Sequence, residues 1–219
     1  MIWLVIGLFS EGSTDSRFLP HIIYRHTLEL ILASGQQNVQ LQEGIILFKE
    51  RENADRVRRI CRETTTVDIF IVHADAAVNA RARILEKIIG DIQGLAYDTC
   101  KIESRRIVSL LPCREMEAWA LVDPDAIARA CGFYAWPEST SRNWNPERAE
   151  SLDDPKATLL AAIAALHSRT RKRRPPQIGD ILERIGTEVD LKQLGRTESF
   201  RIFSGALTKA LQAKGALQV

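Results

Sequence analysis

The apolar runs LVIGLF (residues 4–9) and IFIV (69–72) constrain the fold of this chain most strongly. Neither run alternates apolar with polar residues, and continuous runs of this kind are typical of strands that helices cover on both faces. Strands are expected at 2–9, 39–48, 67–75 and 106–111, and helices at 14–33, 53–64 and 79–95. Repeated strand–helix–strand units predict an α/β core with a mostly parallel sheet and right-handed crossovers.

The chain changes character after residue 131. Residues 133–153 carry two prolines, several aromatic residues and several Asn and Ser, which predicts a long irregular loop. Helical patterns follow at 154–167, 177–185 and 198–214. We therefore expect an α/β core over 1–131, followed by a long loop and a helical subdomain over 132–219, and a chain of 219 residues is long enough for both.

Composition excludes several classes of protein but indicates no function. A hydrophobic content of 45% is ordinary for a globular protein, and a net charge of +2 is too small to indicate a nucleic-acid binder by itself. No stretch approaches the roughly 18 apolar residues of a membrane helix, and the N-terminal run lacks a basic leader, so we expect a cytoplasmic protein with no membrane partner. The four cysteines form no CxxC pair, which predicts reduced thiols: Cys61, Cys100, Cys113 and Cys131.

Acidic residues follow two of the expected strands. Glu11 follows the first strand and Asp75 follows the third, with His73 two residues before it. Because the carboxyl ends of parallel strands lie at one edge of a sheet, the two carboxylates can converge on a hard cation such as Mg²⁺. The alternatives are that the acids cap the following helices and that His73 is a packing histidine. P-loop, GxGxxG, GxSxG and HExxH signatures are absent, which argues against P-loop hydrolases, nicotinamide enzymes, serine hydrolases and zinc proteases.

Four segments carry a resemblance to a known family. FSEGSTDSRFL resembles the opening Glu-Gly motif of Toprim domains, which occur in topoisomerases, primases and OLD-type nucleases, and IFIVHADAA resembles their Asp-x-Asp motif. EGSTDSRFLPHII, VHADA, LPCREMEAWALVDPDAI and DDPKATLL together are similar to the Toprim-related bacterial family called domain of unknown function 4276. The resemblance spans most of the chain and implies a Toprim-like (Rossmann-like) sheet with a C-terminal helical extension.

The resemblance also implies roles for individual residues. Glu11 would be the Toprim glutamate, acting as a general acid or base or as a metal ligand, and Gly12 would permit the tight turn beside it. Asp75 would be the first aspartate of the Asp-x-Asp pair and a ligand of Mg²⁺ or Mn²⁺. The second aspartate of that pair is replaced here by Ala77.

Two glutamates after the fourth strand are candidate replacement ligands. Glu115 and Glu117 can reach the same edge of the sheet, but helical spacing separates them by about 200°, so only one is expected to face the site. We favour Glu117, and a purely structural role is the alternative for both. Asp15 and Asp123 are weaker candidates, and Asp15 can serve the helix dipole alone.

Basic and aromatic residues in the second half suggest a nucleic-acid partner. The run SRTRKRR can neutralise phosphates, and aromatic side chains on the preceding loop can stack on unpaired bases. The alternatives are a solvated loop and core aromatics. The basic candidates are Arg169, Arg171, Lys172, Arg173, Arg174 and Lys156, and the aromatic ones are Tyr134, Trp136 and Trp144.

Two functions of different classes are therefore expected. The first is a Toprim-like nuclease or nuclease subunit that uses Mg²⁺ or Mn²⁺, and the resemblance to OLD-type systems implies a separate ABC-type ATPase and a role in defence against phage or plasmids. The second, which Ala77 favours, is a non-catalytic module that binds nucleic acid or a partner ATPase. Hydrolysis of a small nucleotide is a third alternative.

Overall fold

The protein contains a four-stranded parallel sheet with helices on both faces. The computed structural model describes residues 1–34, 38–75, 84–170 and 177–218. Its sheet has the order β4-β2-β5-β6, and all three strand pairs are parallel. The strands are β2 (Ile6–Phe9), β4 (Ile46–Phe48), β5 (Ile69–His73) and β6 (Ile107–Leu110). The predicted α/β fold with a mostly parallel sheet is confirmed.

Two of the expected strands are each divided into two shorter ones. β1 (Ile2–Leu4) precedes β2 and pairs in parallel with β3 (Val39–Leu41), which precedes β4. The first break falls at Val5, whose N–H donates to the Asp68 carboxylate at 2.8 Å. The second contains Gly44, whose φ of +80° belongs to the left-handed region that favours glycine. The predicted positions of these strands were right, and their continuity was not.

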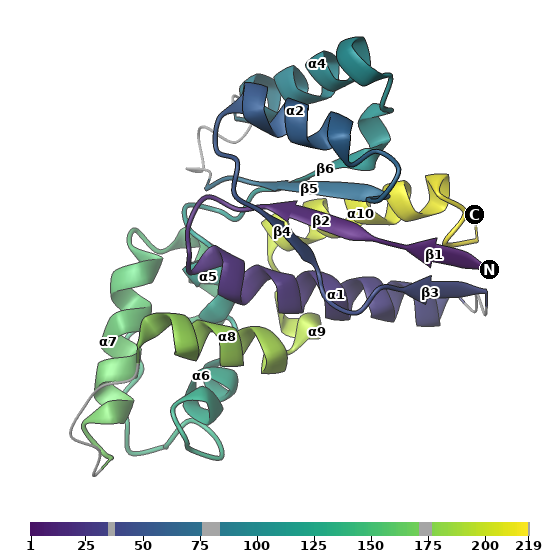
Figure 1. The fold of residues 1–219 in the computed structure, drawn as a ribbon. Coiled ribbons are helices and arrows are strands. Elements are labelled where there is room, and N and C mark those ends of the chain that lie inside the picture. Colours follow the sequence, from purple (N-terminus) through teal and green to yellow (C-terminus); the bar gives the residue numbers. More distant parts are fainter. Residues whose placement is uncertain (35–37, 76–83, 171–176, 219) are drawn as a thin grey trace.

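The helices form two layers, one on each face of the sheet (Figure 1). α2, the π-helix η1 and α4 cover one face, and α1 and α10 cover the other. Every residue of β5 is buried, as expected for a strand with two covered faces. The elements named here are α1 (Asp15–Ala33), α2 (Asn53–Arg62), η1 (Leu85–Gly90), α4 (Asp91–Cys100) and α10 (Glu198–Ala213).

A disulfide bond joins the two helices on the first face. Cys61 at the end of α2 and Cys100 at the end of α4 are bonded, with their Cα atoms 5.6 Å apart. The prediction of four reduced cysteines is therefore wrong for this pair. The helix expected at 79–95 extends to Cys100 through η1 and α4, and its first residues, 79–83, lie outside the described residues.

The second half of the chain packs against α1 and the sheet. Trp119 is fully buried and donates its indole N–H to Ser199 at the start of α10, at 2.7 Å. The Arg17 guanidinium of α1 contacts Asp180 at 2.6 Å and Glu183 at 2.7 Å, both on α8. The remaining elements are η2 (Ser104–Arg106), α5 (Glu117–Ala120), α6 (Pro124–Ala130), η3 (Pro146–Ser151), α7 (Pro155–His167), α8 (Ile178–Glu188) and α9 (Leu191–Leu194).

Among the described residues, no helix is both long enough and apolar enough to cross a bilayer.

The close packing of α8 on α1 depends on Gly186. A Cβ atom at this position would lie 2.6 Å from the backbone carbonyl oxygen of Phe18, which cannot move without shifting α1. We expect Gly186→Ala to lower the free energy of unfolding by about 1–3 kcal/mol. Gly205 in α10 has no atom within 4 Å of such a Cβ, so Gly205→Ala should raise that free energy by about 0.5–1 kcal/mol.

Urea denaturation of both variants, followed by circular dichroism, measures this difference. A Gly186→Ala protein as stable as Gly205→Ala would show that the two helices do not pack this closely in solution.

Candidate functional site

The strand order places a switch in chain direction at the centre of the sheet. The chain leaves β2 toward β4 on one side, and then returns past β2 to β5 on the other. Right-handed crossovers in opposite directions put α1 on one face, and α2 and α4 on the other. Ligands of open α/β sheets bind at the carboxyl ends of the strands at such a switch point. Here those ends are Phe9 of β2 and His73 of β5, and Phe9 pairs with Val72, the residue before His73.

The turn after β2 is built around the buried carboxylate of Asp15. The Gly12 N–H donates to Asp15 Oδ2 at 2.7 Å, and Asp15 is only 6% exposed. A Cβ on Gly12 would lie 3.2 Å from the same oxygen, which is tighter than most real contacts. Gly12 is therefore suited to this turn because it allows close approach of the carboxylate, and its φ lies outside the left-handed region.

His73 lies between two carboxylates. Its Nδ1 is 3.4 Å from Asp15 Oδ2, and its Nε2 is 3.4 Å from Asp75 Oδ1. The ring is completely buried, and neither nitrogen has a hydrogen-bond partner of good geometry among the described residues. A neutral imidazole can donate to only one of the carboxylates, whereas an imidazolium can donate to both. Asp15 and His73 thus connect the turn after β2 to Asp75 after β5.

Sequence reasoning ranked Asp15 too low. In the sequence, Asp15 resembles any acidic residue in the first turn of a helix. Its burial against His73 depends on the pairing of β2 with β5, which the sequence does not show. The pattern Gly-x-x-Asp after a strand could have predicted the hydrogen bond between Gly12 and Asp15. It could not have predicted the contact of Asp15 with His73.

Glu117 is a buried acid at the start of α5, which follows β6. Burial raises the pKa of its carboxyl to about 7, and the negative charges of Glu115 and Asp75 add to this effect. The Glu117 backbone and Lys156 act in the opposite direction. Only 5% of Glu117 is exposed. The structure therefore brings Glu117 into the electrostatic field of Asp75, and perturbed acids of this kind are frequent at functional sites.

Glu115 and Lys156 have a structural explanation. Glu115 Oε2 accepts the backbone N–H of Lys156 in the first turn of α7, at 3.1 Å. A carboxylate that accepts such an N–H stabilises the start of a helix. The Lys156 side chain is exposed, and its charge lies within reach of Glu117.

Glu11 is exposed, and its charge interacts with the guanidinium of Arg56. Arg56 in α2 is 3% exposed, and burial lowers the pKa of its guanidinium, with the charges of Glu11 and Glu52 opposing that effect. Along the described chain, Glu11 forms no hydrogen bond with His73 or another residue of the buried group. Arg56 was not among the predicted site residues, because a single arginine in a basic helix gives no sign of being buried.

The basic run of the second half is described only in part. Arg169 is exposed just after the end of α7, whereas Arg171, Lys172, Arg173 and Arg174 lie outside the described residues, as does Ala77. Of the aromatic candidates, Trp144 is buried and donates its indole N–H to the Leu121 carbonyl at 2.9 Å, which is a packing role. Trp136 packs edge-on against Trp144, and Tyr134 is 96% exposed.

A metal ion would find carboxylates here, but not a complete set of protein ligands. Within the described ranges, no group of three or more His, Cys, Asp or Glu side chains is arranged to hold an ion. Asp75 and Glu117 are two acids whose charges interact, and one or two carboxylates with water and phosphate are a common ligand set for Mg²⁺. The donors thus fit a hard cation that shares its coordination with water or substrate.

Glu117 should make stability depend on pH. Between pH 4.5, the ordinary pKa, and pH 7, the folded protein keeps a proton that the unfolded chain has released, so stability falls as pH rises. Glu117→Gln removes this penalty. It should raise the free energy of unfolding by about 3 kcal/mol at pH 8 and have little effect at pH 4.

Urea denaturation across this pH range, in the presence of a chelator, tests the expectation. The exposed Glu11 gives a matched control, because Glu11→Gln should change stability by less than about 0.5 kcal/mol at both pH values. Equal destabilisation by Glu117→Gln at pH 4 and pH 8 would contradict the raised pKa of the Glu117 carboxyl.

Comparison with known proteins gives one match. Residues 10–205 match the model of a family described as domain of unknown function (DUF4276), and this range contains Glu11, Asp15, His73, Asp75 and Glu117. No curated protein and no solved structure matches the chain. Since the matched range covers most of the sequence, the chain belongs to the DUF4276 family.

Proposed function

We propose that this protein is a Toprim-like, metal-dependent nuclease, or the nuclease subunit of a larger assembly, that hydrolyses nucleic-acid phosphodiesters. The observation that carries the proposal is the buried Glu117 carboxyl, whose pKa is raised to about 7 by burial and by the charges of Glu115 and Asp75. Burial of this carboxyl does not stabilise the folded protein. A bound divalent cation would offset the cost of ionising it. The resemblance of the Glu-Gly turn after β2 and of the acid after β5 to the two Toprim motifs supports the proposal.

The metal in this proposal is Mg²⁺ or Mn²⁺, with Asp75 and Glu117 as its main protein ligands. The bound cation would stabilise negative charge on the scissile phosphate and lower the pKa of an attacking water. The Glu115 carboxylate accepts the backbone N–H of Lys156 in α7, so we place it beside the site rather than in it. Glu11 is a further ligand only if its exposed side chain turns toward Asp75.

The chain's own groups would supply proton transfer and positioning. Glu11 is exposed at the switch point, so it can exchange a proton with solvent and act as general base or acid. His73 lies in contact range of both Asp15 and Asp75, so it can hold the Asp75 carboxylate in one orientation. Asp15 is fixed in turn by the Gly12 N–H.

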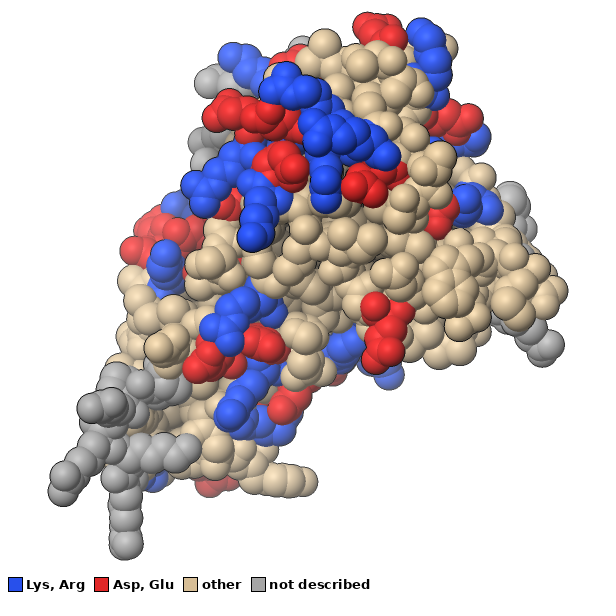
Figure 2. Space-filling model, in the orientation of Figure 1, with Lys and Arg blue, Asp and Glu red and all other residues tan. Residues whose placement is uncertain are grey.

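Arginines near this edge favour a polyanionic substrate. α2 follows β4 at the same edge, and Figure 2 shows Lys and Arg side chains gathered over α2 with acids among them. Arg51 is exposed at this edge, just before α2, and Arg58 within the helix pairs with Asp55. Nucleic-acid phosphates can replace water at such arginines, and Arg169 with the basic run that follows it gives a second region of positive charge.

A separate ATPase completes the proposal. The sequence has no P-loop, so any ATP-driven step requires another chain. The resemblance to OLD-type systems suggests an ABC-type ATPase as that partner, with phage or plasmid defence as the biological role.

Substitution of either Asp75 or Glu117 should strongly reduce cleavage. Asp75→Asn and Glu117→Gln should each lower the rate of cleavage by at least about 100-fold, assayed on single- and double-stranded DNA and RNA with Mg²⁺ or Mn²⁺. Exposed Glu138 outside the site gives a control, and Glu138→Gln should leave the rate unchanged. Asp75→Asn and Glu117→Gln should also lose the heat of Mg²⁺ binding in calorimetry, and Glu138→Gln should keep it. Full activity of folded Asp75→Asn and Glu117→Gln proteins would exclude this function.

The replacement of the second aspartate of the Asp-x-Asp motif by Ala77 favours a second candidate. In this candidate, the protein is a non-catalytic Toprim-like module that binds nucleic acid or a partner ATPase. Replacement of the basic residues of 169–174 by Ser should then reduce binding to a labelled oligonucleotide by about tenfold or more at low salt, while Asp75→Asn binds like the parent. Unchanged binding by the Ser variant would remove this candidate.

A further inference from the structure

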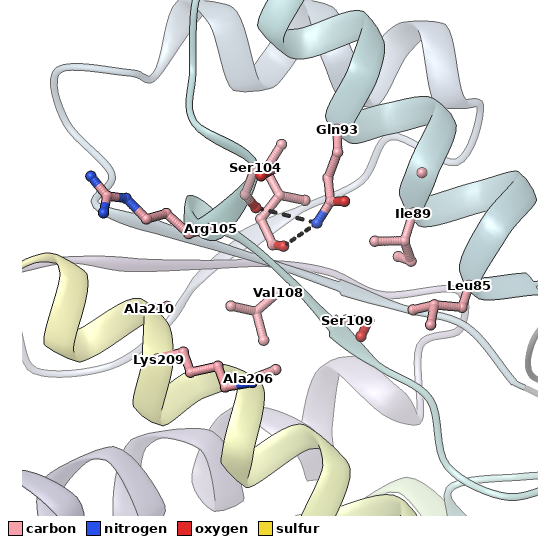
Figure 3. Close-up of a pocket in the computed structure, with 12 residues that line it drawn as sticks. Leu85, Ile89, Gln93, Ser104, Arg105, Val108, Ser109, Ala206, Lys209 and Ala210 are labelled. Atoms are coloured by element: carbon pink, nitrogen blue, oxygen red, sulfur yellow. Dashed lines mark hydrogen bonds between the residues drawn. The ribbon is translucent and has the colours of Figure 1, made fainter.

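A cavity of about 340 Å³ lies along the outer edge of β6, away from the candidate site (Figure 3). β6 is the last strand in the order of the described sheet. In Figure 3, α4 and η1 form one wall of the cavity, α10 forms the opposite wall, and β6 lies between them. None of the acids at the switch point lines it. The cavity therefore needs an explanation of its own.

Backbone groups of β6 point into this cavity. The Leu110 carbonyl accepts the Ala74 N–H at 3.2 Å, toward β5, whereas the Ile107 carbonyl accepts the Gln93 side chain at 2.9 Å, away from β5. Because successive residues of a strand direct their backbone groups to opposite sides, the N–H and C=O of Ser109 point outward as well. In the described part of the chain, no hydrogen bond occupies the Ser109 groups on that side.

The walls of the cavity are apolar and shaped by small residues. Ile89 of η1 lines one wall of the cavity, and Val108 lines it from β6. Ala206 and Ala210 lie one turn apart on α10 and face the strand, and their short side chains leave room beside it. Such a channel can take an extended chain whose alternate side chains pack on the two walls.

The charge at the rim is positive. Two cations and no acids are among the residues that line the cavity. Arg105 is paired with Glu103, whereas Lys209 is exposed and has no ion pair with any described residue. An occupant with an acidic side chain near Lys209 would match this field.

We propose that this groove binds an extended segment of a partner protein, which adds to β6 as a further strand. Backbone hydrogen bonds to Ser109 hold the segment, an apolar side chain enters between Ile89 and Ala206, and an acidic side chain pairs with Lys209. An unpaired strand edge is a frequent site of strand addition, and the flanking helices here restrict access to a single chain. The proposal is independent of the nuclease activity.

Selection of peptides on the whole protein tests this assignment. The probe is a random library of linear heptapeptides displayed on phage, selected on the parent protein and counter-selected on Ala206→Arg, which fills the groove. We expect the selected sequences to combine apolar and acidic residues. The synthetic consensus peptide should then perturb the amide resonance of Ser109 in NMR spectra.

Charge reversal gives the quantitative test. Lys209→Glu should weaken binding of the consensus peptide by about tenfold or more, and Lys192→Glu, an exposed lysine on α9 with no ion pair to a described residue, should not. Circular dichroism should show that the variants are folded. Failure to enrich any sequence, enrichment of basic sequences, or equal binding to Ala206→Arg would each overturn the proposal. A parent dimer that Ala206→Arg converts to a monomer would overturn it as well, because the occupant would then be a second copy.

Discussion

A parallel sheet is stable only when both of its faces are covered, and the rest of this structure follows from how the two covers are made. The crossover from β2 to β4 places α1 on one face, and the crossovers from β4 to β5 and from β5 to β6, which run in the opposite direction, place α2 and α4 on the other. The α1 face is extended by α10 and by the helices of the second half, and their buried side chains form the larger core. The same reversal of direction leaves the ends of β2 and β5 side by side, so the requirement to cover the sheet also creates the candidate site.

The candidate site contains polar groups whose burial does not by itself stabilise the folded protein. His73 is buried between Asp15 and Asp75, and Glu117 is an acid in a position that favours its neutral form. Other buried polar groups among the described residues have hydrogen-bond partners: Asp123 caps α6, and Trp119 bonds to Ser199, although Arg59 Nε, Arg114 Nε and Thr140 Oγ1 have none. Buried polar groups that lack partners at the carboxyl end of a parallel strand are typical of places where a ligand completes the set.

Much of the fold could be predicted from the sequence because its signals are local. Continuous apolar runs, helical periods and the change of composition after residue 131 each lie within a short window. Glu11 and Asp75 could be placed at one edge because parallel strands direct their carboxyl ends alike. The contact of Asp15 with His73, the burial of Glu117 and the bond between Cys61 and Cys100 could not, since each joins segments that only the folded sheet brings together. The break at Val5 likewise depends on the distant carboxylate of Asp68.

The cross-link between α2 and α4 affects the unfolded chain as well as the folded one. Cys61 and Cys100 are 39 positions apart. The covalent ring that they close contains the whole of β5, which ends at His73, and also Asp75. Loop-closure entropy for a ring of this size corresponds to about 4 kcal/mol in favour of the compact state. While the bond is intact, the unfolded chain is therefore confined around the central strand and the residues at its end. The scaffold of the candidate site then stays tethered even when its hydrogen bonds are lost.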